Sequence, residues 1–548
     1  MTKIFFAVTK LPHFSVFYPQ LRLDLSDLQH VETINSRSML INVHCAKCEG
    51  IDAVPVVVEV DIATGIGIHL VGLADTAIKE SLLRTITALQ TMGFRIPGKK
   101  IVINLAPADM HKKGSGYDVP IALGIIAASR QREMPLLEDY MIMGELGLDG
   151  TVRDIPGALP IVELAIKNGL KGCILPLGSA LEAVEYGGIK VYGVETLEEV
   201  LRIVEGEDCP DLLMSGQRRQ QTEETPCDTM DFSEIIGQEG AKRGLEIAAA
   251  GGHNAILIGS QGCGKSSLAK AMAGILPPMS LEESLQTSKI YSVAGKGNPE
   301  GGLMRRRPFR APHYSISVAA LLGGGSDVIR PGEISLAHNG LLLLDEFGEA
   351  PKRILEVLRI PMEERKVTIS RLKSKVEFPA DFMLIAATNP CPCGYYGEGD
   401  RCTCTPSKRL AYLSKLSGPI MDRIDLQLVL SSVDARKLVN RRPAESSAKV
   451  AARVLKAREI QKTRFAEEGI FCNAAMNNRQ IEKFCPLSPE CQSVLERSIE
   501  RMGLSARACS RIIKLARTIA DLAGTSDILP EHISEATSYR ILDRQNLL

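Results

Sequence analysis

The amino-acid sequence of 548 residues predicts an α/β chain, in which two mixed α/β domains are followed by a helical domain. Strand-like and helix-like patterns alternate between residues 39 and 205. Between residues 231 and 435, the apolar runs in AILIGS, LLLLDE and MLIAATN each end in polar residues, as strands of a buried parallel sheet do. In residues 436–548 the apolar positions follow only the helical period.

The composition limits the class of protein. The 65 basic and 65 acidic side chains cancel, so any surface that binds nucleic acid must be local. No apolar run approaches the roughly 18 residues that a membrane span needs. Lys10, Pro12 and His13 interrupt the apolar start of the chain before a signal-peptide core forms. We therefore expect a cytoplasmic protein with no membrane partner, whose 14 cysteines are mostly reduced.

The first α/β domain is expected over residues 39–205. Its segments VPVVVEVDI and KKIVINLA predict strands, and DTAIKESLLRTITALQTMG and VPIALGIIAAS predict helices. Residues 1–38 show no clean periodicity, and we expect either a weakly patterned extension or an alternative translation start. Residues 206–230 are expected to form a linker, because the stretch GQRRQQTEETPCDTMD at 216–231 is polar and almost free of aliphatic residues.

A phosphate-binding motif follows the strand-like run AILI. The segment matches G-x-x-x-x-G-K-[ST], and the helix-like stretch SLAKAMAGIL comes after it. In such a motif the backbone N–H groups surround phosphates, the lysine adds a positive charge, and the hydroxyl binds Mg²⁺. Taken alone, the segment would also fit a Gly-rich turn. The residues expected to bind ATP are Gly259, Ser260, Gln261, Gly262, Cys263, Gly264, Lys265 and Ser266.

Two further strands end in groups that phosphoryl transfer uses. LLLLDE ends in Asp345, expected to hold Mg²⁺ together with Ser266, and in Glu346, expected to polarise the attacking water. MLIAATN ends in Asn389, whose side chain is expected to orient that water. The alternative for the acidic pair is that it caps a helix. With Lys265 as the phosphate-binding cation, these strand ends predict a nucleotide hydrolase.

Two arginines could supply charge to the transition state of such a reaction. Arg423, in SGPIMDRIDL, follows the third strand and is expected to project into the site of a neighbouring subunit. Arg507, in LSARACSR, opens a helix and is expected to reach the phosphates of its own subunit. For either residue, the alternative is a solvated surface arginine.

Together these motifs resemble the AAA+ ATPases of the magnesium-chelatase type. The segments GIDAVPVVVEVDI, VGLADTAIKE, VINLAPAD, KKGSGYDVPIALGI, RPFRAPHYSIS, GGGSDVIRPGEISLAHNG and KVTISR extend the resemblance to the bacterial ComM/YifB family. The resemblance covers residues 39–540. There are two departures: the usual double proline of the phosphate loop is Ser260-Gln261, and residues 1–38 lie outside the pattern.

The resemblance implies both a fold and a function. It implies a Lon/ribosomal-S5-like domain at 39–205, an AAA+ core at 231–435 and a helical lid at 436–548. It also implies a homo-hexameric ring that uses ATP and Mg²⁺, with Arg423 as an arginine finger and Arg507 as a sensor arginine. The implied activity is helicase-type branch migration of DNA during uptake and recombination, which makes recombination proteins candidate partners.

Two alternative functions follow from the same resemblance. A Lon-like domain could cut peptides with a Ser-Lys dyad, but Asp118 stands where the nucleophile belongs, Ser115 is out of register, and Leu159 stands where the lysine belongs. We therefore expect no peptidase activity. The ATPase could also serve a metal chelatase or remodel proteins, but the magnesium-inserting subunit lacks an N-terminal domain of this kind.

The segment EERKVTISRLKSKVEF predicts a basic hairpin between the second and third strands. Its turn carries Arg371, Lys373 and Lys375, which in a ring would point into the pore and follow DNA phosphates without reading sequence. The alternative is a solvated charged hairpin.

Four cysteines lie close together in NPCPCGYYGEGDRCTCTP. Two C-x-C pairs on a Gly-rich loop would suit a structural Zn²⁺ site with all four positions filled, while redox pairing and the absence of any role are the alternatives. The pair Cys45 and Cys48 has no second pair nearby in the sequence, and we expect no function for it. The candidate zinc ligands are Cys391, Cys393, Cys402 and Cys404.

Overall fold

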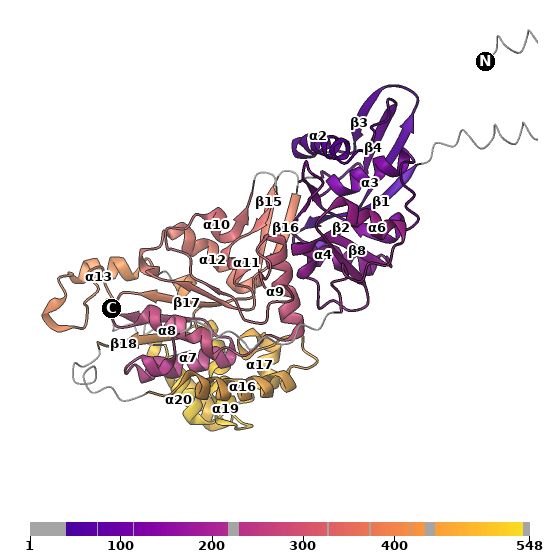
Figure 1. Ribbon diagram of the computed structural model, residues 1–548. Helices are drawn as coiled ribbons and strands as arrows, with labels where there is room; N and C mark the ends of the chain where they lie inside the picture. Colours follow the sequence, from indigo (N-terminus) through magenta and orange to yellow (C-terminus); the bar gives the residue numbers. More distant parts are fainter. Residues whose placement is uncertain are drawn as a thin grey trace, which may run out of the picture.

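The computed structural model shows a mixed α/β domain, a second α/β domain and a C-terminal group of helices (Figure 1). The expectations for residues 1–38 and for most of the polar linker lie outside the described part of the chain. The described residues are 40–73, 75–112, 114–216, 230–325, 328–371, 374–416, 418–432 and 444–540.

The N-terminal domain is built on a seven-stranded mixed sheet in the order β3-β4-β2-β1-β5-β8-β9. β2 pairs antiparallel with β1 and β4, whereas β5, β8 and β9 run parallel to one another. Its strands are β1 (Ile41–Glu49), β2 (Asp52–Ala63), β3 (Gly67–Val71), β4 (Lys100–Ala106), β5 (Tyr140–Ile142), β6 (Glu145–Leu146), β7 (Val152–Arg153), β8 (Gly172–Pro176) and β9 (Lys190–Val194). Its helices are α2 (Thr76–Thr91), α3 (Asp118–Ala128), η1 (Leu137–Asp139), α4 (Ala158–Lys167), α5 (Leu177–Leu181) and α6 (Leu197–Glu205).

The first hydrophobic core forms between this sheet and its helices. Every second residue of β4, from Ile101 to Leu105, is buried, as the period of a half-covered strand requires. α3 is apolar on all sides and packs inside the domain, where Gly124 lies so close to Val60 that a Cβ atom would be 2.5 Å from it. A glycine is therefore needed where helix and sheet approach each other.

The N-terminal domain extends beyond the boundary expected at residue 205. Cys209 is buried in the first core, the N–H of Gly193 donates to the carbonyl of Leu212 at 2.9 Å, and that of Met214 donates to Val191 at 2.8 Å. The expected linker included residues 206–216, although the polar stretch that indicates a linker begins only at residue 216. They instead cover the edge of β9, which would otherwise expose unpaired backbone groups.

The second domain contains a five-stranded sheet in the order β11-β14-β17-β10-β18, in which every pair is parallel. Its strands and hairpins are β10 (Ala255–Gly259), β11 (Phe309–Arg310), β12 (Gly323–Gly324), β13 (Arg330–Pro331), β14 (Leu341–Leu344), β15 (Lys366–Arg371), β16 (Ser374–Pro379), β17 (Met383–Thr388) and β18 (Leu426–Leu430). Its helices are η2 (Phe232–Glu234), α7 (Glu239–Gly251), α8 (Lys265–Met272), η3 (Ala273–Ile275), α9 (Leu281–Val293), α10 (Val318–Leu322), α11 (Glu333–Leu336), η4 (Phe347–Glu349), α12 (Lys352–Glu364), η5 (Gly399–Arg401), α13 (Pro406–Leu413) and α14 (Gly418–Met421).

Both faces of this sheet are covered, as expected for a parallel sheet. Alternate residues of β10 enter different cores: Leu257 faces α7, α8 and the C-terminal helices, while Ile258 faces α12 and α14. The three apolar runs recognised in the sequence are the adjacent central strands β14, β17 and β10. Their carboxyl ends consequently lie at one edge of the sheet.

The C-terminal helices share a hydrophobic core with the second domain. Leu245 of α7 and Leu515 of α19 belong to the same buried cluster, and α16, α19 and α20 lie beneath α7 in Figure 1. The helices are α16 (Ser447–Arg464), η6 (Asn473–Ala475), α17 (Asn478–Phe484), α18 (Pro489–Met502), α19 (Ala506–Ala523) and α20 (Pro530–Ser538).

The N-terminal domain docks on α9 of the second domain. The N–H of Gly157 donates to the carbonyl of Ser292 at 3.0 Å, and Glu163 forms an ion pair with Lys289. Leu303 inserts into the N-terminal core. Among the described residues, no helix has the length and apolar character to cross a membrane.

Candidate active site

The phosphate-binding motif forms a tight loop between β10 and α8. Gly262 and Gly264 have φ angles of +77° and +90°, which favour glycine. The Nζ atom of Lys265 donates hydrogen bonds to the carbonyl oxygens of Gly259 at 2.7 Å and Ser260 at 2.8 Å. The ammonium group is therefore folded onto the loop, at the N-terminus of the following helix.

Ser266 and Asp345 meet at the carboxyl edge of the sheet. The Oγ atom of Ser266 donates to Oδ2 of Asp345 at 2.5 Å. A hydroxyl and a carboxylate are oxygen donors of the type that Mg²⁺ prefers, so this pair fits the expected ion. Glu346 comes next, with an exposed side chain and a φ of +52° that turns the chain sharply after the strand.

Asn389 completes the group at this edge. It follows β17, and its Oδ1 atom accepts a hydrogen bond from Lys265 Nζ at 3.0 Å. Because β14, β17 and β10 are neighbours in the sheet, side chains from three distant stretches of sequence converge here.

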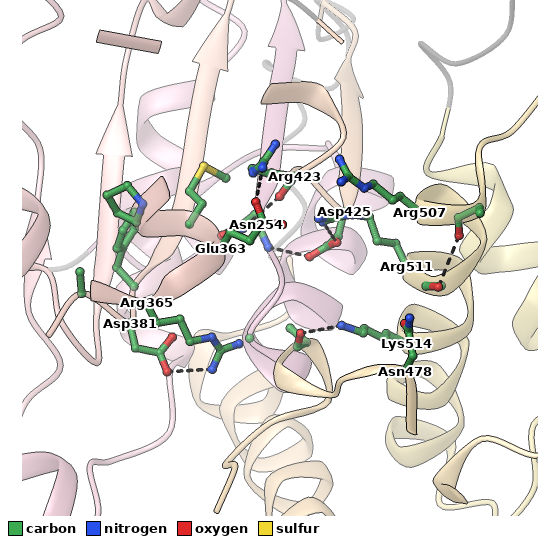
Figure 2. A pocket seen from close by; sticks show the side chains of 18 residues that line it. Asn254, Glu363, Arg365, Asp381, Arg423, Asp425, Asn478, Arg507, Arg511 and Lys514 are labelled. Carbon is green, nitrogen blue, oxygen red and sulfur yellow. Dashed lines mark hydrogen bonds and ion pairs between the residues drawn. The ribbon is translucent and has the colours of Figure 1, made fainter. Parts of the chain in front are cut away.

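A second site lies at the opposite, amino edge of the same sheet. A pocket of about 440 Å³ opens where β10, β17 and β18 begin and where α12 and α19 approach them (Figure 2). Five cations face three carboxylates in it, so the pocket suits an anion. The charged residues that line it are Glu363, Arg365, Asp381, Arg423, Asp425, Arg507, Arg511 and Lys514.

Arg423 is mostly buried in this pocket. One terminal nitrogen donates to the carbonyl of Pro419 at 2.7 Å, and the other forms an ion pair with Glu363. Its Nε–H group is buried and makes no hydrogen bond with any residue that the structure describes. An unsatisfied buried donor is costly, so an incoming acceptor would be favoured here.

Arg507 lies in the same pocket and does not reach the phosphate loop of its own subunit, contrary to our expectation. The reason is the docking of α19. That helix approaches the sheet at the start of β18, whereas the phosphate loop follows the end of the neighbouring parallel strand β10. A five-residue strand, about 17 Å long, separates the two edges. Arg423 and Arg507 thus come together, but not with Lys265.

Asp425 anchors α19 at the pocket floor. It forms an ion pair with Arg511, and its Oδ2 atom lies 3.3 Å from Nδ1 of His253. Burial alone would raise the pKa of Asp425, but the charge of Arg511 and the hydrogen bond from His253 outweigh burial, and the pKa lies below its usual value. The Nε2 atom of His253 lies 2.9 Å from the Thr518 hydroxyl of α19, which extends the connection.

The four clustered cysteines lie on the loop between β17 and α13. Their sulfur atoms all lie within 4.8 Å of one another. Cys391 is buried, and the backbone N–H of Tyr395 holds the pKa of Cys393 at about 6, so its thiolate is favoured. The geometry fits a metal site of four thiolates.

Three family models match the chain in sequence order. A model of the ChlI subunit of magnesium chelatase matches residues 58–179, a second ChlI model matches residues 231–438, and the model of the ChlI C-terminal region matches residues 444–540. YifB of Salmonella typhimurium is 42% identical over 504 residues, covering 92% of this chain and 97% of the relative. The competence protein ComM of Haemophilus influenzae is 39% identical over 497 residues, covering 90% and 96%.

The chain belongs to the ComM/YifB family of magnesium-chelatase-like AAA+ ATPases. The expected fold class is confirmed by this membership and by the parallel sheet. Membership also supports an ATPase that uses ATP and Mg²⁺.

Two more distant relatives match parts of this ComM/YifB chain. The archaeal Lon protease of Methanocaldococcus jannaschii is 28% identical over 144 residues, which is 26% of this chain and 22% of the relative. The DNA replication licensing factor Mcm6 of Drosophila melanogaster is 25% identical over 343 residues, which is 57% of this chain and 37% of the relative.

The residues at the positions of the Lon dyad are occupied by packing, ion-pair and hydrogen-bond contacts. Asp118 is fully buried at the start of α3, paired with Arg84 at 2.6 Å and hydrogen-bonded to Ser81. Leu159 is buried in α4, and Ser115 hydrogen-bonds to Glu145. Asp118 therefore anchors α2 to α3, and its two oxygens are already engaged.

The expected basic hairpin is present as β15 paired antiparallel with β16. Arg371 and Lys375 are exposed near its tip, and Lys373 lies outside the described residues. Near its base, Gly50 of the N-terminal domain packs so closely that a Cβ atom would be 2.9 Å from the carbonyl of Glu377.

Sequence reasoning missed several residues of the second pocket. Arg511 and Lys514 follow Arg507 by four and seven positions, so the helical period could have grouped the three on one face of α19. Glu363 had no such signal, because its contact with Arg423 joins residues 60 positions apart.

Proposed function

We propose that this chain is an Mg²⁺-dependent ATPase that works as a hexameric ring and moves DNA, driving branch migration. The observation that carries the proposal is the separation of two half-sites. Lys265, Ser266, Asp345 and Asn389 gather at one edge of the sheet, while Arg423 and Arg507 gather at the other. A ring joins the first edge of one subunit to the second edge of the next.

Each residue at the carboxyl edge has a role in this proposal. The loop 259–266 binds the phosphates of ATP, and Ser266 with Asp345 would hold Mg²⁺, which supplies charge neutralisation when it is bound. Glu346 takes the proton of the attacking water, and Asn389 orients that water. Lys265, now bonded to its own loop, would exchange those carbonyl contacts for phosphate oxygens.

In this proposal, the pocket at the amino edge of one subunit supplies arginines to the phosphate-binding site of the neighbouring subunit. The buried Nε–H of Arg423 has no partner among the described residues, and Arg507 is exposed beside it. Both would stabilise charge that develops on the γ-phosphate bound by the neighbouring subunit, the step at which an arginine contributes most.

Mixing two inactive variants tests this arrangement. Lys265→Ala lacks a phosphate-binding cation, and Arg423→Ala lacks the finger. In an equal mixture, about a quarter of the interfaces join an intact loop to an intact arginine, so ATP turnover should recover to about a quarter of the normal rate. Arg359→Ala, at an exposed position of α12, is the control and should turn over ATP normally.

The mixing experiment can also refute the shared active site. If both variants assemble and Arg423→Ala binds ATP normally, yet the mixture remains inactive, the shared site is refuted. Loss of ATP binding by unassembled Arg423→Ala subunits would also contradict the proposal, because that residue lies away from its own phosphate loop.

DNA is the proposed substrate of the motor. Arg371 and Lys375 are exposed on the β15–β16 hairpin, where they could contact phosphates in a pore. Two relatives, named as a competence protein and a DNA replication licensing factor, support the same class of partner. Recombination proteins would then be the natural partners of the ring.

ATP turnover should therefore be measured without DNA and with single-stranded DNA, duplex DNA and a four-way junction at one moderate salt concentration. The junction should stimulate turnover most, and the replacement Lys375→Ala should reduce stimulation more than Lys352→Ala, which alters an exposed lysine outside the hairpin. Absence of stimulation by every DNA would favour a chelatase-like or protein-remodelling ATPase.

A metal other than Mg²⁺ is also part of the proposal. The cluster of Cys391, Cys393, Cys402 and Cys404 would hold a structural Zn²⁺, because its four sulfur atoms lie within 4.8 Å of one another.

A further inference from the structure

We propose that Zn²⁺ held by the four-cysteine loop fixes a clasp on the phosphate-binding loop, so that zinc loading controls how well the chain binds ATP. The clasp consists of residues 391–404 and their contacts with Ser260 and Gln261. The effect on ATP rests on the proposed ATPase function, whereas the zinc site stands by itself.

Three of the four sulfur atoms already lie at spacings close to those of a tetrahedral zinc site, and all four lie within 4.8 Å of one another. A zinc ion with Zn–S bonds of about 2.3 Å places its sulfurs about 3.8 Å apart. The Sγ atom of Cys402 lies 3.8 Å from that of Cys391 and 3.7 Å from that of Cys393, while Cys391 and Cys393 are 3.3 Å apart. Four thiolates fill every position, so the site would be structural and have no open position for a substrate.

The clasp touches the phosphate loop at two adjacent residues. The Oγ atom of Ser260 donates a hydrogen bond to Oε1 of Glu398, which lies between the two cysteine pairs. Gly394 packs against Gln261, and a Cβ atom there would lie 3.2 Å from Cγ of Gln261. These contacts fall on the two positions where the family usually carries prolines, which would stiffen the loop by themselves.

Glu398 is held in position from within the clasp. Arg401 forms an ion pair with it at 3.4 Å and lies 5.9 Å from the ring centre of Tyr395. From α13, Arg409 stacks over Tyr396 at 4.0 Å. The cysteine loop therefore has ordered contacts on both sides, and zinc would join its two halves.

Both ends of the clasp are connected to the active site. Its first cysteine comes two residues after Asn389, and α13 begins shortly after the last one. The hydroxyl of Tyr412 in α13 is buried 3.3 Å from the Thr388 hydroxyl, directly before Asn389. Loss of zinc would thus loosen both the phosphate loop and the strand end that carries Asn389.

The first test measures metal in the full-length chain purified under reducing conditions. One Zn²⁺ per chain is expected by native mass spectrometry, together with its release when a mercurial blocks the thiols. Cys393→Ser should lose the ion, while Cys509→Ser, at a cysteine outside the cluster, should keep it. A chain that contains no zinc and takes up none when zinc alone is added refutes the site. A disulfide within the cluster of the freshly reduced protein refutes it as well.

The second test measures the affinity for a fluorescent ATP analogue. Zinc-stripped protein should bind it about three- to tenfold more weakly, corresponding to roughly 0.7–1.4 kcal/mol. Glu398→Gln should weaken binding in the same direction and retain zinc. Lys408→Ala, at an exposed position of α13, should change neither quantity.

The outcomes separate the two proposals. Equal nucleotide affinity with and without zinc refutes the clasp but leaves the ATPase intact. A zinc-loaded wild-type chain that binds no nucleotide refutes the ATPase itself. Weaker binding by the zinc-free chain that returns when zinc is added supports both.

Discussion

Glu346 combines an exposed carboxylate with a left-handed backbone, directly after the residue proposed to hold Mg²⁺. Its replacement by Gln keeps the shape but removes the base. ATP turnover by Glu346→Gln should fall at least about a hundredfold while ATP stays bound, because proton transfer contributes on that scale. Turnover and retained nucleotide are the measurements, with Glu349→Gln as an exposed control in η4. Ordinary turnover by Glu346→Gln would remove Glu346 from this role.

Glu363 restrains the proposed finger by an ion pair with Arg423. The hydrogen bond from Arg423, with Arg507 and Arg511 nearby, holds the pKa of Glu363 below its usual value, so the group stays ionised as the pH falls. A neighbour's phosphate must compete with this carboxylate for Arg423.

Glu363→Gln should therefore raise ATP turnover at low ATP concentration by about twofold, because it weakens a competing ion pair. In an Arg423→Ala background, Glu363→Gln should leave the low residual turnover unchanged, as a double-mutant cycle on the residual rates would show. Glu364→Gln, at the next exposed carboxylate, provides the control. An equal increase with and without Arg423 would show that the two residues act independently.

The convergence of Lys265, Asp345 and Asn389 was predictable because Asp345 and Asn389 directly follow apolar strands and Lys265 ends the loop after a third, and parallel strands bring their carboxyl ends together. The position of Arg507 could not be predicted in the same way. It depends on how a helix more than 70 residues beyond β18 docks, and no local pattern records that. Local motifs therefore specified one half-site, and tertiary packing specified the other.

α19 carries Arg507 of the second half-site, and the ion pair Arg511–Asp425 links this helix to the start of β18. Asp425→Asn leaves Arg511 without its partner at a largely buried position. It should lower the free energy of unfolding by about 3 kcal/mol, and ATP turnover should fall because Arg507 shifts with the helix.

Hydrogen exchange of α19 and denaturant unfolding are the measurements for Asp425→Asn. Adding Arg511→Gln should recover part of the loss, since the two effects are coupled. Exchange in α3, which lies in another domain, should remain unchanged. Faster exchange there to the same extent would indicate general unfolding instead of release of α19.

The turn after α11 and the segment before β17 are joined through His338. Its Nδ1 atom accepts from the backbone N–H of Asp381 at 3.0 Å, and burial lowers its pKa to about 4. An unfolded histidine has a pKa of about 6.5, so the unfolded chain binds more protons between these values, and stability falls as the pH drops through this window.

At pH 5 the expected loss from His338 is about 2 kcal/mol relative to pH 7. The replacement His338→Gln should flatten the pH dependence of unfolding by that amount. Denaturant titrations at both pH values measure it, with exposed His313→Gln as the control. A pH dependence that His338→Gln leaves unchanged would contradict this origin.

At the scale of the whole molecule, a nucleotide should link neighbouring subunits. In the proposed ring, ATP bound to one subunit contacts Arg423 of the next. Binding across an interface stabilises assembly by mass action. Sedimentation should show hexamers of Glu346→Gln with ATP and smaller species without it. A Glu346→Gln, Arg423→Ala double variant should assemble less at the same ATP concentration. Equal assembly would mean that nucleotide does not bridge the subunits.

The division into an α/β domain, a parallel-sheet domain and helices followed from periodicity, which each segment carries by itself. Two features did not follow from it. Residues 206–216 are loop-like in sequence and cover β9 only because that edge needs partners. The docking of Leu303 in the N-terminal core depends on a contact between domains that no single segment encodes.

The buried cluster that Leu245 shares with Leu515 has a mechanical consequence. A lid joined to its sheet by a continuous apolar core cannot swing on a loose hinge, because opening the joint would expose that core to water. The sheet and the lid would then move together as one rigid body. In the proposed ring, movement driven by ATP hydrolysis would therefore occur at the interfaces between subunits, where the exchangeable ATP would be bound.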